Sequence, residues 1–125
     1  MQRISSLPAR FLAVGALLTA ASGSAVARMP YDGKWNVVVT SQAGNCEVAY
    51  RYGLRIANGS ISYRGDAPIA LSGRVDASGR VRVSIRYGRQ SANAIGRLSR
   101  TVGSGTWRGW AQRQQCAGHW QARRL

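Results

Sequence analysis

The sequence predicts an all-β protein in which about eight antiparallel strands, connected in chain order, close into an up-and-down barrel. Apolar and polar residues alternate with a period of two in several segments, as in strands that have one buried face. Turn-forming residues separate these segments at short and regular intervals. A small β-sandwich is the alternative. The barrel is favoured because closure removes exposed edge strands, and because eight strands enclose a lumen that side chains can just fill.

The first half of the chain contains three of the expected strands. Alternation near residues 35–39 predicts the first, and a turn at 41–44 leads to a long second strand over 46–56. Asn58-Gly59 is expected to join this strand to the third, at 60–64, as a hairpin. This dipeptide suits the positive φ angles of a type I′ turn.

The second half continues the same pattern up to a last strand expected over 116–124. Residues 71–75 and 80–87 alternate and flank a turn at 76–79, and in 80–87 the arginines all fall on one face. Glycines around Trp107 are expected to mark bends or close approaches of the wall; they are Gly103, Gly105 and Gly109. The other turns are expected at 65–68, 88–90 and 100–103, with a last break around Gln114 and Gln115.

The N-terminal segment is predicted to be a cleaved secretory signal peptide, residues 1–27. Two arginines precede a short apolar run at 11–20, and small residues then end in Ala25-Val26-Ala27. The run is shorter than the roughly 20 residues that a membrane-spanning helix needs, so no transmembrane span is expected in the mature chain. A single domain, residues 28–125, is expected in the periplasm or outside the cell.

The chain has two cysteines, Cys46 and Cys116, and export makes a disulfide between them the simplest interpretation. The bond would close a loop of 71 residues, which is worth about 4 kcal/mol in the chain-entropy model. A domain this small has a core that alone is only marginally stabilising. The disulfide is therefore expected to supply a large share of the stability.

Cys116 and His119 are three residues apart, a spacing that metal and haem sites also use. In a strand, residues an odd number apart point to opposite faces, and these two would be about 10 Å apart. A structural zinc site needs four nitrogen or sulfur ligands, which the chain does not supply. The four acidic residues lie in or beside expected turns, and no nucleophile motif is present. We therefore expect no metal site, no catalytic residues and no cofactor.

The charge is strongly positive. The net charge is +14, and loss of the two leader arginines lowers it by two, to +12. Arginines on outward strand faces, with the outward Trp110, predict a surface that binds anions; the residues are Arg51, Arg55, Arg74, Arg80, Arg82, Arg86, Arg108 and Trp110. The alternative is a solvated face that keeps an exported barrel soluble.

Two resemblances extend this interpretation. Gly33-Lys34-Trp35 opens the first strand, and Arg123 and Arg124 close the last. This resembles the calycins (lipocalins and avidins) and implies a barrel in which an arginine of the final strand covers Trp35. Over the whole mature chain, the motifs G-x-W, S-G-R-V, G-S-G-T-W-x-G and C-x-G-x-W-x-A-R resemble a group of short exported alphaproteobacterial proteins. Some of these are labelled for haem utilisation or adhesion, and the resemblance implies no particular site residues.

The expected function is non-catalytic binding in the cell envelope, with the arginine-rich surface facing an anionic lipid headgroup, a glycan or an acidic protein. Nucleic acid is not an expected partner of an exported protein. The alternatives are a periplasmic protease inhibitor and a carrier of a small ligand, haem included, with His119 as its axial ligand. The lumen volume tests the carrier hypothesis. A lumen filled by side chains excludes a carrier, and an open lumen makes a carrier the leading hypothesis.

Overall fold

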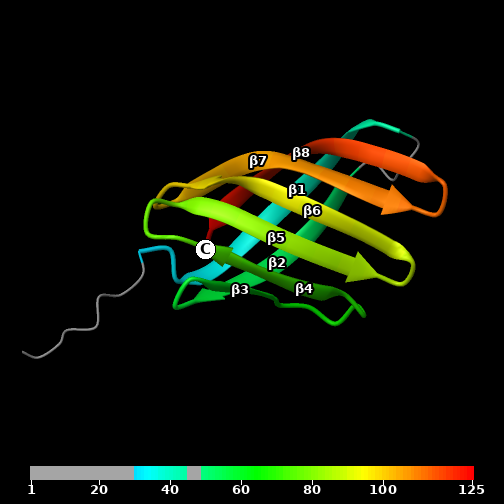
Figure 1. The fold of residues 1–125 in the computed structure, drawn as a ribbon. Coiled ribbons are helices and arrows are strands. Elements are labelled where there is room, and N and C mark those ends of the chain that lie inside the picture. The colour runs from blue at the N-terminus through cyan, green and yellow to red at the C-terminus, as the bar shows by residue number, and fades with distance from the viewer. Residues whose placement is uncertain (1–29, 45–48) are drawn as a thin grey trace, which may run out of the picture.

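The computed structural model describes residues 30–44 and 49–125. Eight antiparallel strands are hydrogen-bonded in chain order, and β1 also pairs with β8, so the sheet closes into a barrel (Figure 1). This confirms the predicted all-β up-and-down barrel and excludes the sandwich. The strands are β1 (Gly33–Ala43), β2 (Ala49–Ala57), β3 (Ser60–Tyr63), β4 (Ala70–Val75), β5 (Arg80–Tyr87), β6 (Gln90–Leu98), β7 (Val102–Ala111) and β8 (Gln114–Arg124). In this part of the chain no helix has the length and apolarity to cross a membrane.

The two ends of the barrel differ. Because the strands alternate in direction, the turns after β2, β4 and β6 lie at the same end as the C-terminus, on the left in Figure 1. The connections after β3, β5 and β7 lie at the opposite end. We call the first end the closed end and the second the mouth.

The closed end contains the tightest part of the core. Trp35 is 1% exposed, and its indole Nε1 donates a hydrogen bond to the Tyr31 carbonyl at 2.9 Å. The Arg124 guanidinium lies 5.6 Å from the centroid of the Trp35 ring and donates to the carbonyls of Pro30 and Asp32. The contact between Trp35 and a last-strand arginine, implied by the calycin resemblance, is therefore present. It links the start of the fold to its end.

Acidic side chains hold two of the closed-end turns. Asn58 and Gly59 have φ angles of 53° and 79°, as the predicted type I′ hairpin requires. The Asp32 carboxylate accepts hydrogen bonds from both of their amides, at 2.8 and 3.2 Å. In the turn after β4, the Ser78 hydroxyl donates to Asp76 at 2.6 Å. This hydrogen bond, with those from nearby backbone amides, lowers the pKa of the Asp76 carboxyl.

Two of the predicted turns were placed wrongly. The first strand does not stop before 41–44, because β1 continues to Ala43. Its pairing with the long strand β8 extends to Ala43, with a shift in register between Ser41 and Ala43. The last break is at Gln112-Arg113 and not at Gln114-Gln115, which begin β8. Gln112 adopts a φ of 56°, a conformation more usual for glycine or asparagine, so its residue type does not indicate a turn there.

Candidate functional site: an apolar lumen

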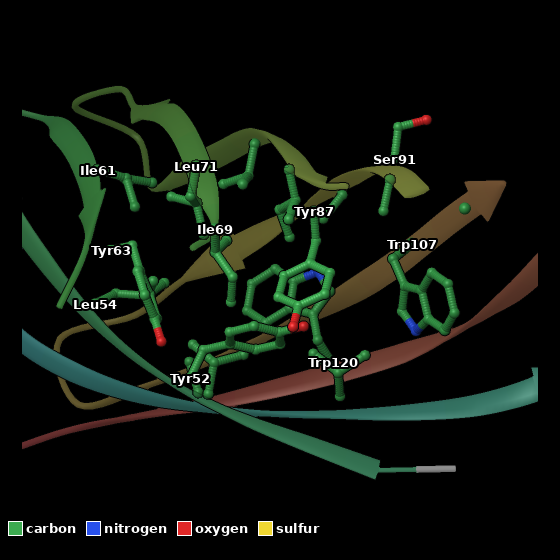
Figure 2. Close-up of a pocket in the computed structure, with 18 of the residues that line it drawn as sticks. Tyr52, Leu54, Ile61, Tyr63, Ile69, Leu71, Tyr87, Ser91, Trp107 and Trp120 are labelled. Atoms are coloured by element: carbon green, nitrogen blue, oxygen red, sulfur yellow. The ribbon is translucent and has the colours of Figure 1, made fainter. Parts of the chain in front are cut away.

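A cavity of about 470 Å³ lies inside the barrel. Its walls are aliphatic and aromatic side chains contributed by all eight strands. In Figure 2, labelled side chains such as Tyr52, Ile69 and Leu71 point into this space. Among the residues described, no polar or charged side chain is buried. The polar residues on the lining include Arg51, Gln90 and Ser91, which lie where strands begin or end at the mouth. The deep part of the cavity is therefore apolar and its entrance is polar.

The lumen remains open because two tryptophans lie along the wall. In the β7–β8 pairing, Gly105 is opposite Trp120, and Trp107 is opposite Gly118. Trp120 Nε1 donates to the Ile95 carbonyl on β6 at 3.0 Å, so its indole reaches across β7 at Gly105. Each of these two glycines lacks the Cβ that would collide with the ring opposite it.

Trp107 on β7 lies against Gly118 of β8, as Trp120 on β8 lies against Gly105 of β7. Its Nε1 donates to the Thr40 carbonyl on β1 at 2.9 Å, so the indole reaches across β8 at Gly118. A Cβ at Gly118 would overlap the Thr40 carbonyl oxygen and lie 2.8 Å from Trp107 Nε1. Both indoles are thus held flat against neighbouring strands by hydrogen bonds to backbone carbonyls, and the centre of the barrel remains unfilled.

Two aromatic residues lie where the cavity meets the solvent. Tyr87 ends β5 and Trp110 lies near the end of β7, and both line the cavity. They are nonetheless 46% and 40% exposed. Tyr87 follows the inward residues Val83 and Ile85 in the alternation of β5 and is exposed nonetheless, so the cavity opens at the mouth. The expectation that Trp110 lies at the surface is confirmed.

The connection between β3 and β4 covers part of the lumen. Ala67 and Ile69 from this connection line the cavity, beside Tyr63 at the end of β3. The Tyr63 ring meets that of Tyr52 edge to face, with centroids 6.3 Å apart. Aromatic side chains of β2 and β3 therefore form the wall beneath this connection (Figure 2).

The arginines predicted to form a single anion-binding patch fall into three groups. Arg51 and Arg55 are on β2, which β3 separates from β4 and β5. Arg86 and Arg108 are near the mouth, in the same region as Trp110. The third group lies nearer the closed end on β4 and β5 and consists of Arg74, Arg80 and Arg82.

Cross-strand pairing adds a fourth member to the third group. Arg74 is directly opposite Arg82, and Arg80 is directly opposite Arg97 on β6, which sequence reasoning did not select. We call these four residues the arginine cluster. Their pairing depends on strand register, which could have been anticipated only by counting back from the turns on either side of β5.

Cys116 and His119, considered as disulfide or ligand residues, do not form one site. Cys116 is buried and lines the cavity, whereas Cys46 lies outside the described residues, as does the expected leader, so the disulfide and the signal peptide stay predictions. His119 is exposed on β8 and is not on the cavity lining. The chain's single histidine therefore cannot be the axial ligand of a haem bound in the lumen. Within 30–44 and 49–125, no three His, Cys, Asp or Glu residues gather as a metal site would require.

Fold and site together define a class, an eight-stranded β-barrel with an apolar internal cavity that opens at one end. Comparisons with protein-family models, with curated proteins and with solved structures found no match. The two resemblances noted in the sequence stay predictions. The geometry of the lumen and of the charged surface is therefore what supports a functional proposal.

Proposed function

We propose that this protein is a non-catalytic exported carrier that binds an apolar small molecule in the lumen of its barrel, in the periplasm or outside the cell. The cavity of about 470 Å³ is the observation that supports this proposal. Its size is within the range of ligand-binding pockets, roughly 300–1,000 Å³. Ligand binding thereby replaces the arginine-rich surface as the leading hypothesis.

The lining determines the chemical class of the ligand. Apolar cavities tend to remain dry and to bind apolar molecules, because their walls offer water no hydrogen-bond partners. A ligand with a charge deep in the lumen would lose its hydration without gaining a partner. We therefore infer an apolar body in the lumen, with any polar group of the ligand near Arg51, Gln90 and Ser91 at the mouth.

Filling the lumen should abolish binding. Ala94 lines the cavity from β6, opposite Trp107. We expect Ala94→Phe to weaken binding of the neutral dye N-phenylnaphthylamine by at least about tenfold, equivalent to 1.4 kcal/mol, because the new ring occupies the space of the dye. Dye fluorescence titration measures the affinity. Wild type saturated at 100 times the dissociation constant should gain about 2.7 kcal/mol of stability, seen as a raised melting temperature.

Ala57→Phe is the matched control. Ala57 is exposed at the closed end of β2, so the same substitution adds the same ring outside the lumen and should leave dye affinity unchanged. Equal affinities of Ala94→Phe and Ala57→Phe for the dye would show that the dye binds elsewhere. Failure of the folded wild type to bind any neutral apolar dye would refute the carrier.

The arginine cluster favours a second function, binding of an anionic glycan. Like charges directly opposite each other destabilise a sheet, and Arg74 faces Arg82 in this way. Among the described acids, Asp76 interacts with Arg80 and so offsets part of the second pair. No acidic residue lies on the strands β4, β5 and β6 themselves. Sulfate or carboxylate groups of a glycan would relieve this repulsion through bidentate contacts.

Heparin chromatography tests the arginine cluster. We expect Arg74→Ser/Arg82→Ser to elute at lower salt than Arg89→Ser/Arg113→Ser, which removes the same charge from turns at the mouth. Contacts to polyanions depend on salt through the number of cations engaged. Identical elution of the two double variants would mean that retention on heparin depends only on the net charge of the protein. Glycan binding by the arginine cluster would then be rejected.

A further inference from the structure

The mouth carries a second set of arginines beside its exposed aromatic residues. Arg86 pairs with Ser91, which pairs with Trp110 on the next strand, so the three lie in one row across the sheet. Arg108 precedes Trp110 by two residues on the same face of β7. Arg89 and Arg113 lie in the turns on either side, after β5 and β7. Together with Tyr87 these residues form what we call the rim patch, which consists of Arg86, Tyr87, Arg89, Arg108, Trp110 and Arg113.

The rim patch is strongly cationic and is open to solvent. Its four arginines, its tyrosine and its tryptophan are all exposed. Of the acidic residues in the described ranges, Asp32 and Asp76 lie at the closed end, and Asp66 lies at the mouth, in the connection between β3 and β4, which carries no residue of the rim patch. Four exposed arginines and two exposed amphipathic rings therefore lie at the same end of the barrel, where the apolar cavity opens.

We propose that the rim patch docks the mouth on an anionic lipid surface and that the apolar ligand passes between lumen and membrane there. This inference rests on the proposed function, since it names the source of the ligand. Tryptophan and tyrosine favour the boundary between headgroups and acyl chains. Arginines near an anionic bilayer are attracted to it by about 1 kcal/mol each.

The position of the aromatic rings favours a membrane over a soluble acidic protein. Tyr87 lies at the opening on the inward face of β5, and Trp110 lies at the same end on the outward face of β7. Rings at these positions that entered the headgroup region would place the opening against the acyl chains. An apolar ligand could then move without crossing water. An acidic protein bound to the same arginines would instead cover the entrance.

Vesicle sedimentation tests the docking surface. We expect wild type to bind vesicles of phosphatidylglycerol and phosphatidylcholine at physiological salt and to bind pure phosphatidylcholine much more weakly. Arg89→Ser/Arg113→Ser should bind the mixed vesicles about tenfold or more weakly. Arg74→Ser/Arg82→Ser removes equal charge from β4 and β5 nearer the closed end and should bind within about twofold of wild type. Trp110→Ser should also bind the mixed vesicles more weakly than wild type.

Equal weakening by the two double variants would overturn the docking surface, because attraction would then follow net charge alone. Absence of wild-type binding to the mixed vesicles would overturn it as well. The affinity for the dye, measured in the absence of vesicles, tests the carrier proposal independently of membrane docking. The two double variants, whose residues do not line the cavity, should retain the N-phenylnaphthylamine affinity of wild type, so loss of vesicle binding with intact dye binding in Arg89→Ser/Arg113→Ser concerns the rim patch only.

Discussion

Trp35→Ala is expected to destabilise the fold by about 3–5 kcal/mol, as is usual when a buried tryptophan is truncated. Trp35 is among the largest fully buried side chains of the described residues. Alanine leaves a large cavity, removes the donor to the Tyr31 carbonyl and leaves the Arg124 guanidinium without the ring beneath it. Because domains are stable by only about 5–15 kcal/mol in total, urea unfolding should show a large shift in midpoint.

Trp110→Ala provides the comparison for this experiment. Trp110 is 40% exposed and has no role in the closed-end core, so the same truncation should lower the free energy of unfolding by less than about 1 kcal/mol. Trp35→Phe should lie between the two, because it retains a ring but loses the hydrogen bond. A loss below about 1 kcal/mol for Trp35→Ala would show that the closed end does not depend on this contact.

The strands and the closed end were predictable because local rules specify them. Period-two alternation identifies a strand whatever its partners are, and Asn58-Gly59 identifies its turn from the φ angles that these two residues tolerate. The contact between Trp35 and Arg124 followed from a resemblance carried by short motifs at the two ends of the chain. The turn at Gln112 was not predicted, because glutamine is not a residue type that indicates a positive φ.

The open lumen could not be predicted, because side-chain direction across the barrel depends on strand register. The sequence shows that Trp107 and Trp120 alternate inward, and bulky inward residues in eight strands suggest a filled interior. Only the pairing of Gly105 with Trp120 and of Trp107 with Gly118 explains why both rings lie along the wall.

The division of the arginines has the same cause. Alternation places Arg55, Arg74 and Arg86 on outward faces, but it does not say that β3 separates the first from the others. Nor does it show that Arg74 and Arg86 lie toward opposite ends of the barrel. One predicted patch thus became a cluster near the closed end, a rim patch at the mouth and a separate pair on β2.

Gly105→Ala is expected to destabilise the protein by about 2–3 kcal/mol and to abolish binding of N-phenylnaphthylamine. In an ordinary strand this substitution would stabilise by about 0.5–1 kcal/mol, so the predicted sign is reversed. A Cβ at this position would overlap the Ile95 carbonyl oxygen and meet the Trp120 ring. The Ile95 carbonyl belongs to the β6 backbone, which must shift here at a cost in stability. The Trp120 ring loses its place beside residue 105, so we expect it to leave the wall and enter the lumen.

Gly109→Ala separates this effect from any general loss of a strand glycine. Gly109 lies on the same inward face of β7, but a Cβ there would come no closer than 3.0 Å, to the edge of the Trp107 ring. The next contact would be the Ser91 carbonyl oxygen at 3.2 Å, so a small shift of the ring and of the β6 backbone suffices. The loss of stability should stay below about 1 kcal/mol, with dye binding retained. If urea titration and dye titration gave the same values for both variants, the Trp120 ring would not be what keeps the lumen open. A joint loss of stability and dye binding in Gly105→Ala alone would identify the pairing of glycine with tryptophan as the device that makes a small barrel hollow.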